Sequence, residues 1–370
     1  MKKSQIISGS KTKQSFGTIL PDDGIAKSEE SNLDHMHFQS LNPGYDPGRR
    51  RFLGGIIALG ALALPGIRAM ALPRIRVMAE LGQEMTFSLG GDLTVNRLGF
   101  GAMRLPSVGG MSGPPRSPET SRAVLRRAVE LGVNLIDTAN FYGNQDGSIH
   151  ANTLIRETLY PYPSNLVIAT KVGPNVDTTG RPLTPLYGPA SDLRAQVEAN
   201  LEALRLDRLD LVYLRVGLMG PPQDESIAEH FEMLAKLREE GLIRHLGLSN
   251  VDVNHIAEAR AIAPVAAVQN YFNIIRRDGE DVLDFCAANH IAYIPFGPLG
   301  SGGREDLHTD RVTKVAVRHD ATVYQIALAW LLAYSPVTLA IPGTGRVDHL
   351  EENWAARSIV LSKQDMDELA

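Results

Sequence analysis

Three side chains that can share a proton stand close together in the first half of this chain. Asp137 and Tyr142 lie in residues 137–143, DTANFYG, and Lys171 lies in residues 169–172, ATKV. A Lys ammonium beside a buried phenol stabilises the phenolate, so the pKa of the phenol falls toward neutral pH. A carboxylate such as Asp137 keeps that Lys charged and oriented. The three residue types together predict a proton donor built on Tyr142.

The segments that would position these side chains alternate in type from about residue 85 onward. Short apolar runs, typical of parallel strands covered by helices, alternate with longer helical patterns. We expect strands at residues 97–103, 134–137, 166–171, 209–215, 243–249, 266–270, 292–296 and 338–341. We expect helices at residues 118–131, 151–159, 191–204, 226–240, 253–261, 278–289, 323–334 and 347–356. Before them, residues 86–89 and 93–96 flank Gly90-Gly91-Asp92, which is the pattern of a β-hairpin.

These β-α units in series predict the α/β class. An open doubly wound sheet is one solution, but a closed (β/α)8 TIM barrel with an N-terminal β-hairpin better explains why eight βα units follow one another. In such a barrel the catalytic groups lie at the carboxyl ends of the strands. Polar or turn-forming residues stand at these ends: Asp137, Lys171, Arg215, Ser249-Asn250, Gln269, Phe296 and Pro342-Gly343.

Asp137, Tyr142 and Lys171, with the spacing between them, resemble the catalytic residues of the aldo-keto reductase family. The resemblance runs from about residue 86 to residue 360. It implies NAD(P)H-dependent reduction of a small aldehyde or ketone to an alcohol, with Tyr142 as the proton donor. The small-molecule carbonyl substrate is the only partner that it implies, and a monomer is favoured.

One position departs from the family pattern. The family usually carries His in a motif like Asp-Leu-x-x-x-His, whereas the matching residues 210–215, DLVYLR, end in Arg215. A branch of the family with Arg here includes pyridoxal reductases. Arg donates from a rigid, permanently charged fork, so Arg215 is expected to polarise the carbonyl or to hold an anionic group of the substrate. The alternative is that it turns toward a neighbouring carboxylate.

The loss of the usual His also supports a second hypothesis. The chain would then be a catalytically weak module that holds the dinucleotide and senses redox state or serves a partner. The intact Asp137, Tyr142 and Lys171 argue against that hypothesis.

Two further groups of residues resemble the family's nicotinamide site. Ser249, Asn250 and Gln269 match its grip on the carboxamide, since they supply the donors and acceptors that an amide requires. Ordinary strand-end hydrogen bonding is the alternative. Phe296 takes the place of the aromatic residue that stacks on the nicotinamide. A Gly-rich loop follows Phe296, and its backbone N–H groups would approach the pyrophosphate of the cofactor. The cofactor-binding residues expected from this loop are Gly297, Leu299 and Ser301.

Residues 341–353, IPGTGRVDHLEEN, resemble the family's adenosine-phosphate segment, where a helix N-terminus can hold a phosphate. Glu352 and Asn353 match the residues that bind adenine. The Lys and Arg that usually support the 2′-phosphate of NADP are replaced by Gly343 and His349. Thr344 and Arg346 are the available substitutes, so the resemblance implies NADP as the cofactor, with NAD as the alternative.

The composition gives no reason to expect nucleic-acid binding or a metal. The net charge is −5, which is not the balance of a nucleic-acid-binding protein. A single cysteine, Cys286, excludes an internal disulfide and a Cys-based metal site. The ten His residues show no ligand pairing, so no metal is expected.

Residues 1–71 differ in composition from the rest. Residues 1–48 are polar without an apolar face and are expected to be disordered. Residues 49–53, RRRFL, precede an apolar run that is shorter than the roughly 20 residues that span a bilayer, and Ala69-Met70-Ala71 forms a small-x-small cleavage site. This pattern predicts a signal peptide, and it resembles a twin-arginine (Tat) signal. The barrel, residues 72–370, would then be periplasmic; if the start codon or the signal is wrongly assigned, it would be cytoplasmic. Met36 is an alternative start.

Overall fold

The computed structural model describes residues 84–110, 113–177, 182–217, 225–301 and 305–370. The expected leader, residues 1–71, and its boundary with the barrel domain lie outside these ranges.

Seven parallel strands form one curved sheet in the order β11-β10-β9-β8-β5-β4-β3. Neighbouring strands are also neighbours along the chain, as in a barrel built from successive βα units. The strands are β3 (Phe100–Gly101), β4 (Leu135–Asp137), β5 (Val167–Val172), β8 (Leu209–Arg215), β9 (Ile243–Ser249), β10 (Val265–Gln269) and β11 (Ala292–Tyr293).

Residues 337–342 join the two edges of this sheet and complete the (β/α)8 barrel. On one side Tyr293 donates its N–H to the Val337 carbonyl at 2.8 Å, and on the other side Gly99 donates to the Ala340 carbonyl at 2.8 Å. We expected a regular eighth strand at 338–341, but only single bridges link it to Tyr293 and to residue 98. Pro342 is one reason, because it has no N–H with which to extend a ladder.

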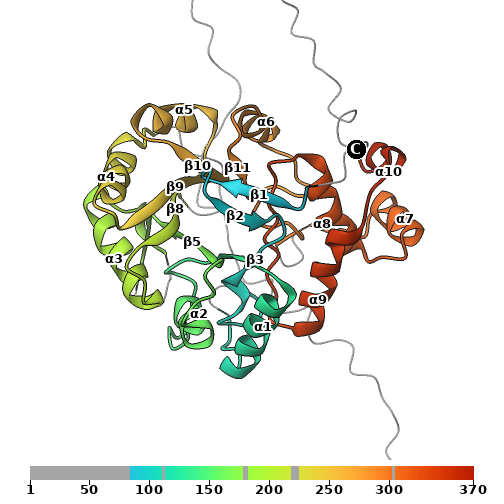
Figure 1. The fold of residues 1–370 in the computed structure, drawn as a ribbon, viewed down its shortest axis with the longest axis horizontal. Coiled ribbons are helices and arrows are strands. Elements are labelled where there is room, and N and C mark those ends of the chain that lie inside the picture. The colour runs from blue at the N-terminus through green and yellow to red at the C-terminus, as the bar shows by residue number, and fades with distance from the viewer. Residues whose placement is uncertain (1–83, 111–112, 178–181, 218–224, 302–304) are drawn as a thin grey trace, which may run out of the picture. The chain divides into compact units, whose positions relative to one another are not determined.

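Helices surround the strands (Figure 1). The expected helices all form, with bounds within two residues of those predicted, and Gly132 caps the end of α1. No helix in the described ranges is long and apolar enough to cross a membrane. The helices of the ring are α1 (Pro118–Leu131), α2 (Ala151–Leu159), α3 (Leu193–Leu204), α4 (Ala228–Glu239), α5 (Val253–Ile262), α6 (Glu280–Ala288), α8 (Val323–Tyr334) and α9 (Val347–Ala355).

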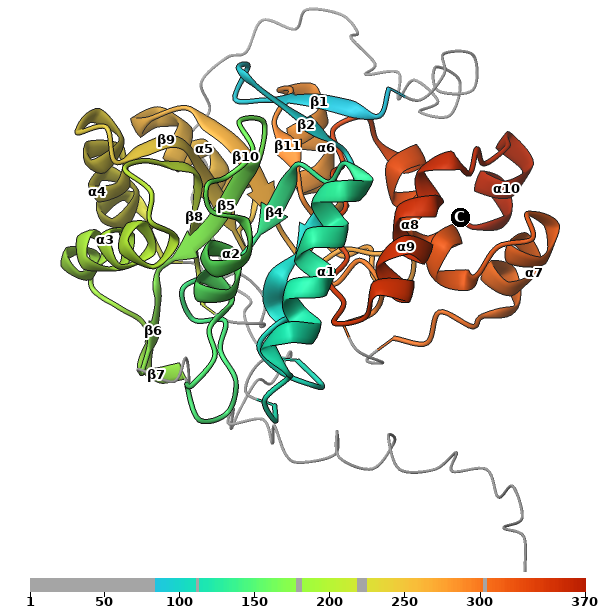
Figure 2. The ribbon, with the colours of Figure 1, turned by 60° about the horizontal axis from the view of Figure 1, so that its bottom comes forward.

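Two hairpins lie at opposite ends of the barrel (Figure 2). The expected hairpin, β1 (Thr86–Leu89) with β2 (Leu93–Asn96), covers the amino ends of the strands and buries Phe87, Leu89 and Val95. The second hairpin, β6 (Pro174–Val176) with β7 (Pro182–Tyr187), follows β5 at the carboxyl end. Its sequence is rich in Pro and Gly, and we did not predict it as a strand pair.

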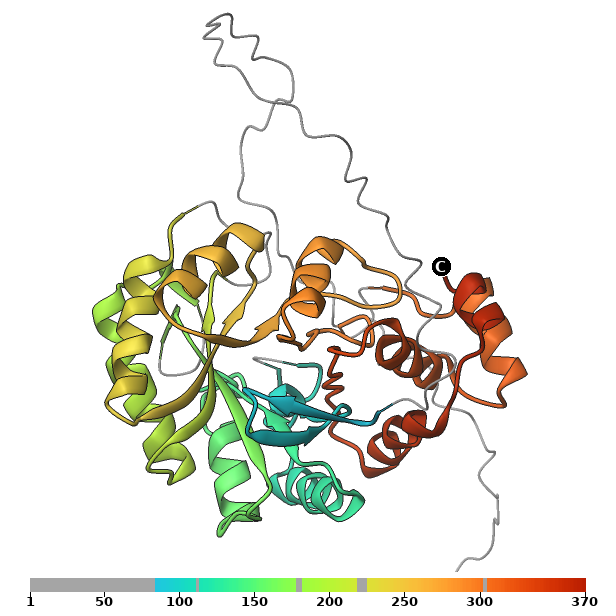
Figure 3. The same cartoon turned by 45° about the horizontal axis from the view of Figure 1, so that its top comes forward.

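The C-terminal part contains two further helices that the sequence did not predict. These are α7 (Asp310–Arg318) and α10 (Lys363–Glu368), which pack against each other outside the ring (Figure 3). The Asp365 carboxylate joins them, since it pairs with Arg318 and lies 3.0 Å from His319 Nε2. This contact ties the end of the chain to the barrel.

Candidate active site

Asp137, Tyr142 and Lys171 meet at the carboxyl ends of β4 and β5. Lys171 Nζ donates to Asp137 Oδ1 at 2.6 Å and to the Thr138 carbonyl at 2.9 Å. The same nitrogen lies 5.0 Å from the centroid of the Tyr142 ring. Asp137 and Lys171 are each 3% exposed, and Tyr142 is 9% exposed. The structure therefore places a buried ion pair directly beside a buried phenol.

The pKa of Tyr142 differs from what the sequence led us to expect. Burial raises the pKa of the Tyr142 phenol, and the positive charges of Lys171 and Arg215 lower it without cancelling that effect. Our expectation of a lowered pKa is therefore wrong, because the cost of dehydrating the phenolate exceeds the stabilisation that the ammonium gives. For Lys171 the balance is the reverse. Burial lowers its pKa, but Asp137 and Tyr142 outweigh burial and the net pKa is raised, so Lys171 stays charged.

Arg215, the last residue of β8, points into the same site. Its Nη1 donates to Ser249 Oγ at 3.0 Å and its Nε donates to the Gly217 carbonyl at 3.3 Å. The guanidinium carbon lies 4.6 Å from the centroid of the Phe296 ring. Burial lowers the pKa of Arg215 to about 10, which leaves it charged at neutral pH. Within the described ranges it makes no ion pair with a carboxylate, unlike Lys171.

Ser249, Asn250 and Gln269 form a row of polar side chains next to Arg215. Ser249 Oγ donates to the Gln269 carbonyl at 2.8 Å, and Asn250 Nδ2 donates to the Val216 carbonyl at 2.8 Å. Gln269 Nε2 donates to Asp137 Oδ2 at 2.8 Å. We did not predict this last bond, since β4 and β10 lie on opposite sides of the barrel. It gives both oxygens of Asp137 a donor.

One acceptor in this row has no hydrogen-bond partner. Gln269 Oε1 is buried and receives no hydrogen bond from the residues that the structure describes. Leaving a buried acceptor unpaired costs about 1–3 kcal/mol. The NH₂ group of a carboxamide would satisfy it, so the residues present fit a nicotinamide at this position.

The loop after β11 brings Phe296 to the mouth of the barrel. The Phe296 ring lies 5.3 Å from the ring of Tyr271. Gly297 follows with a φ of 68°, and a Cβ there would collide with the Tyr271 ring, so a larger residue would strain the backbone and displace that ring. Leu299 and Ser301 are half-buried in the same loop.

Residues 341–353 lie next to the first strand of the barrel. The backbone of Gly343 packs so closely on Gly101 that a Cβ would overlap the Gly101 carbonyl. Thr344 is buried, and its Oγ1 accepts from the Arg346 N–H at 3.1 Å. The Arg346 side chain is exposed, and its Nε donates to Asp348 Oδ1 at 3.0 Å.

Helix α9 carries the remaining residues of that segment. His349 is exposed and Asn353 is buried. Glu352 Oε1 accepts from Thr322 Oγ1 at 2.6 Å, at the N-cap of α8. One oxygen of this predicted adenine ligand therefore already has a donor from the protein.

A cation that we did not predict lies beside this segment. Arg116 Nη1 donates to the Gly345 carbonyl at 3.4 Å, and its Nε donates to the Arg104 carbonyl at 3.1 Å. Arg116 follows an irregular Pro- and Gly-rich loop, and no pattern in the sequence marks it. It ties that loop to the turn before α9.

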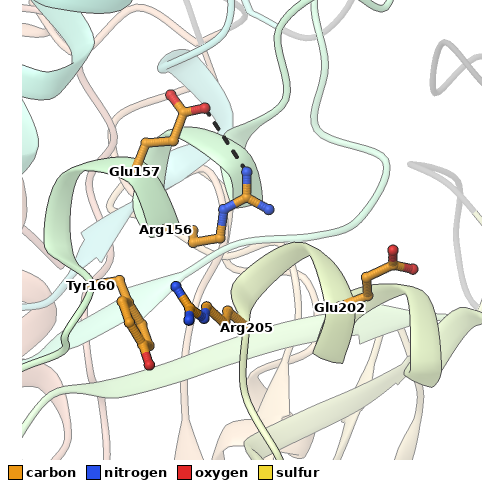
Figure 4. Close-up of a pocket in the computed structure, with 5 residues that line it drawn as sticks. All are labelled: Arg156, Glu157, Tyr160, Glu202 and Arg205. Carbon is orange, nitrogen blue, oxygen red and sulfur yellow. Dashed lines mark ion pairs between the residues drawn. The ribbon is translucent and has the colours of Figure 1, made fainter.

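A surface groove of about 430 Å³ lies elsewhere, between α2 and the end of α3 (Figure 4). Arg205 covers the ring of Tyr160 there, with its guanidinium carbon 4.5 Å from the ring centroid. The residues that line this groove include none of those predicted for catalysis or cofactor binding: Arg156, Glu157, Tyr160, Glu202 and Arg205.

Comparisons with known proteins identify relatives of this chain. The sequence profile of the Aldo/keto reductase family matches residues 97–370. Pyridoxine 4-dehydrogenase of Escherichia coli (strain K12) is 45% identical over 287 residues, which cover 77% of this chain and 96% of that protein.

Two solved structures share the fold. A thermostable aldo-keto reductase in complex with the inhibitor epalrestat has a TM-score of 0.65 at 31% identity, covering 77% of this chain and 98% of the other. An aldo-keto reductase from Klebsiella pneumoniae in complex with NADPH has a TM-score of 0.64 at 26% identity, covering 77% and 94%. The family profile and the identity to a relative that it covers almost completely lead to one conclusion: this chain belongs to the aldo/keto reductase family.

Proposed function

We propose that this chain reduces a small aldehyde of the pyridoxal class to the alcohol, using NADPH. The observation that carries the proposal is the buried Asp137–Lys171 ion pair beside Tyr142, with the charged Arg215 facing the same site. The family membership and the name of the Escherichia coli relative, a pyridoxine 4-dehydrogenase, support the reaction type and the substrate class.

Tyr142 supplies the proton. Because burial raises its pKa, the phenol is fully protonated at neutral pH and is ready to donate to a carbonyl oxygen. The charge of Lys171 then stabilises the phenolate that remains, and Asp137 holds Lys171 in place through the 2.6 Å contact. When bound, NADPH supplies the hydride that the carbonyl carbon receives.

The cofactor would be held by the polar row and the mouth of the barrel. Gln269 Oε1 would accept from the carboxamide, Ser249 and Asn250 flank it, and Phe296 would offer the nicotinamide the part of its ring that Arg215 does not cover. The loop that follows contributes Gly297, Leu299 and Ser301. The segment before and within α9 contributes Gly343, Thr344, Arg346, His349, Glu352 and Asn353 to the adenosine end.

Arg215 gives the site its preference for an anionic substrate. Among the described residues Arg215 has no carboxylate partner, and its bonds to Ser249 and the Gly217 carbonyl only partly replace the water that a buried cation loses. Pyridoxal carries a phenolate next to its aldehyde, and a guanidinium can donate to both groups from one plane. Arg215 would therefore hold the phenolate and help to polarise the carbonyl.

NADPH consumption by the purified full-length chain, with pyridoxal and with a neutral aromatic aldehyde of similar size, tests the proposal. Turnover should be seen with both substrates and should be faster with pyridoxal. Binding of NADPH without turnover of any aldehyde would contradict it and would leave a dinucleotide-binding module.

We also infer that residues 49–71 direct export by the twin-arginine route, as the RRRFL string and the Ala69-Met70-Ala71 site indicate. This route carries folded proteins, which suits an enzyme that closes around its cofactor before export. A fusion of residues 1–71 to a reporter that works only after folded export should reach the periplasm. Replacing Arg49 and Arg50 by Lys should block it, and indifference to the two arginines would contradict the inference.

A further inference from the structure

A buried chain of polar side chains lies directly behind the Asp137–Lys171 pair. Thr138 Oγ1 donates to Asn152 Oδ1 at 2.8 Å, and Asn152 Nδ2 donates to Asn200 Oδ1 at 3.0 Å. Thr170 Oγ1 donates to the same Asn200 oxygen at 2.6 Å. None of the four residues is more than 2% exposed.

This chain is connected to the catalytic pair through the backbone. Successive residues of a strand point to opposite faces, so Thr138 and Thr170 point outward where Asp137 and Lys171 point into the barrel. Asn152 belongs to α2 and Asn200 to α3, the two helices that cover this part of the sheet. The network therefore ties two strand ends to two helices at the level of the catalytic groups.

Helix α3 contacts β5 on both sides of Lys171. Asn200 binds Thr170 before it, and Gln196 Oε1 accepts from the Gly173 N–H after it at 2.7 Å. Asn200 Nδ2 donates to the Gln196 backbone carbonyl at 2.8 Å, which fixes the orientation of the Asn200 amide. The position of the Lys171 backbone is thus set from α3.

The network also fixes what Lys171 binds. The Lys171 ammonium donates to the Thr138 carbonyl at 2.9 Å, and the side chain of Thr138 is held by Asn152. The Asn200 amide therefore helps to hold both the Lys171 backbone, from which the side chain extends, and Thr138, whose carbonyl accepts from the ammonium. An apolar side chain in its place would pack as well but would leave two buried donors without a partner.

We propose that Asn200 is a positioning residue that holds the Lys171 ammonium against Tyr142 through Thr170 on one side and Asn152 with Thr138 on the other. The proposal rests on the function proposed above for Tyr142 and Lys171. It assigns a task to residues that touch neither substrate nor cofactor.

Of the groups that face the Tyr142 phenol, Lys171 is the cation whose position depends on this network. They are Asp137 from β4, Lys171 from β5, and Tyr213 and Arg215 from β8. Arg215 is held by Ser249 and by the Gly217 carbonyl, which lie outside the network. If the network loosens, Lys171 moves away from the phenol while Arg215 stays. The phenolate is then less stabilised, so the pH at which Tyr142 ionises should rise and proton transfer should slow.

Thr170→Val and Thr170→Ser form a matched pair that tests the network with little change in shape. Val removes only the hydroxyl that binds Asn200, and Ser retains it. We expect Thr170→Val to lower kcat about 10-fold, since small misplacements of catalytic groups have effects of this size or larger. The KM for the aldehyde and the Kd for NADPH should stay within about twofold. The basic limb of the kcat profile should move about half a pH unit upward, and Thr170→Ser should behave like the unmodified chain.

Asn200→Leu breaks both branches and should give a larger effect of the same kind. Circular dichroism and thermal unfolding report whether it folds, and if it does not, the Thr170 pair still decides. A Thr170→Val variant with unchanged kcat and pH profile would overturn the proposal, as would an equal loss in Thr170→Ser. Tyr142→Phe, measured in parallel, distinguishes failure of this proposal from failure of the proposed function. If Tyr142→Phe stays active, the proposed function fails. If it is inactive while Thr170→Val is normal, only the role of Asn200 fails.

Discussion

The Arg215 guanidinium lies against the ring of Phe296, with 4.6 Å between its central carbon and the ring centroid. The contact joins the end of β8 to the loop after β11, across the mouth of the barrel. An aromatic face stabilises a cation without neutralising it. Arg215 is therefore held in place while its charge remains available to a ligand.

Replacing Arg215 by Ala should lower kcat/KM for pyridoxal more than for a neutral aldehyde of similar size. The physical reason is that only pyridoxal offers an anionic oxygen to the guanidinium. The difference between the two substrates should approach about 2–4 kcal/mol, the contribution of a buried charged donor. Steady-state kinetics with both substrates measures it.

Arg215→His serves as the matched variant, since His can still donate to a carbonyl oxygen. It should recover part of the activity toward the neutral aldehyde and little of the preference for pyridoxal. Equal kinetics of the Ala variant and the unmodified chain on both substrates would make Arg215 a structural residue.

Replacing Arg346 by Ala should weaken the binding of NADPH more than the binding of NADH if this side chain contacts the 2′-phosphate. Arg346 is exposed and pairs with Asp348, so screening by solvent reduces its contribution, and we expect a loss of about 5- to 10-fold in NADPH affinity. Fluorescence titration with both cofactors measures this. Arg126→Ala, which removes an exposed arginine paired with Glu119 on α1, is the control and should change neither affinity. An equal loss for NADPH and NADH would place Arg346 away from the 2′-phosphate.

Replacing Arg97 by Met should destabilise the barrel without altering its chemistry. Arg97 is 2% exposed, and its guanidinium donates to the carbonyls of Leu332, Ser335 and Thr338 at 2.7, 2.6 and 3.1 Å. Met would leave these buried acceptors unpaired, at a cost of about 3 kcal/mol or more in the free energy of unfolding. Urea unfolding followed by circular dichroism measures it, and a loss below about 1 kcal/mol would show that water replaces the guanidinium.

Much of this architecture could be predicted because parallel strands and their covering helices leave a strong apolar pattern. Helices α1, α2 and α8 and strands β8 and β9 have the bounds that the sequence indicated. The conformation of the segment near residue 340 could not be predicted from this pattern, because apolar character alone does not distinguish a regular strand from an extended segment next to Pro342. The helix α7 was missed because its sequence, DRVTKVAVR, is mostly polar.

The polar residues of the site were found at the strand ends, but their partners were not. The bond from Gln269 to Asp137 joins strands that are far apart in the sequence, and no local pattern encodes it. The same holds for Arg116 against Gly345. The pKa of Tyr142 was predicted in the wrong direction because the prediction counted the stabilising charge of Lys171 but not the larger cost of dehydrating the phenolate.

The pH profile of the unmodified enzyme should reflect that burial. Reduction requires the protonated phenol, and the pKa of Tyr142 lies above its ordinary value of about 10. The rate of reduction should therefore stay constant through neutral pH and fall only above about pH 10, whereas oxidation of the alcohol, which requires the phenolate, should rise with pH over the same range. Initial rates in both directions between pH 6 and about pH 10.5 test this, and a basic limb for reduction centred well below about pH 9 would contradict it.

The central claim is that Tyr142 donates the proton, and Tyr142→Phe tests it most directly because it removes only the hydroxyl. Single-turnover reduction of pyridoxal by the NADPH-loaded enzyme should slow by about 10²- to 10⁴-fold, the range for loss of a general acid. The Kd for NADPH should stay within about twofold of the original. A Phe variant that reduces pyridoxal at a rate close to that of the unmodified enzyme would contradict the account.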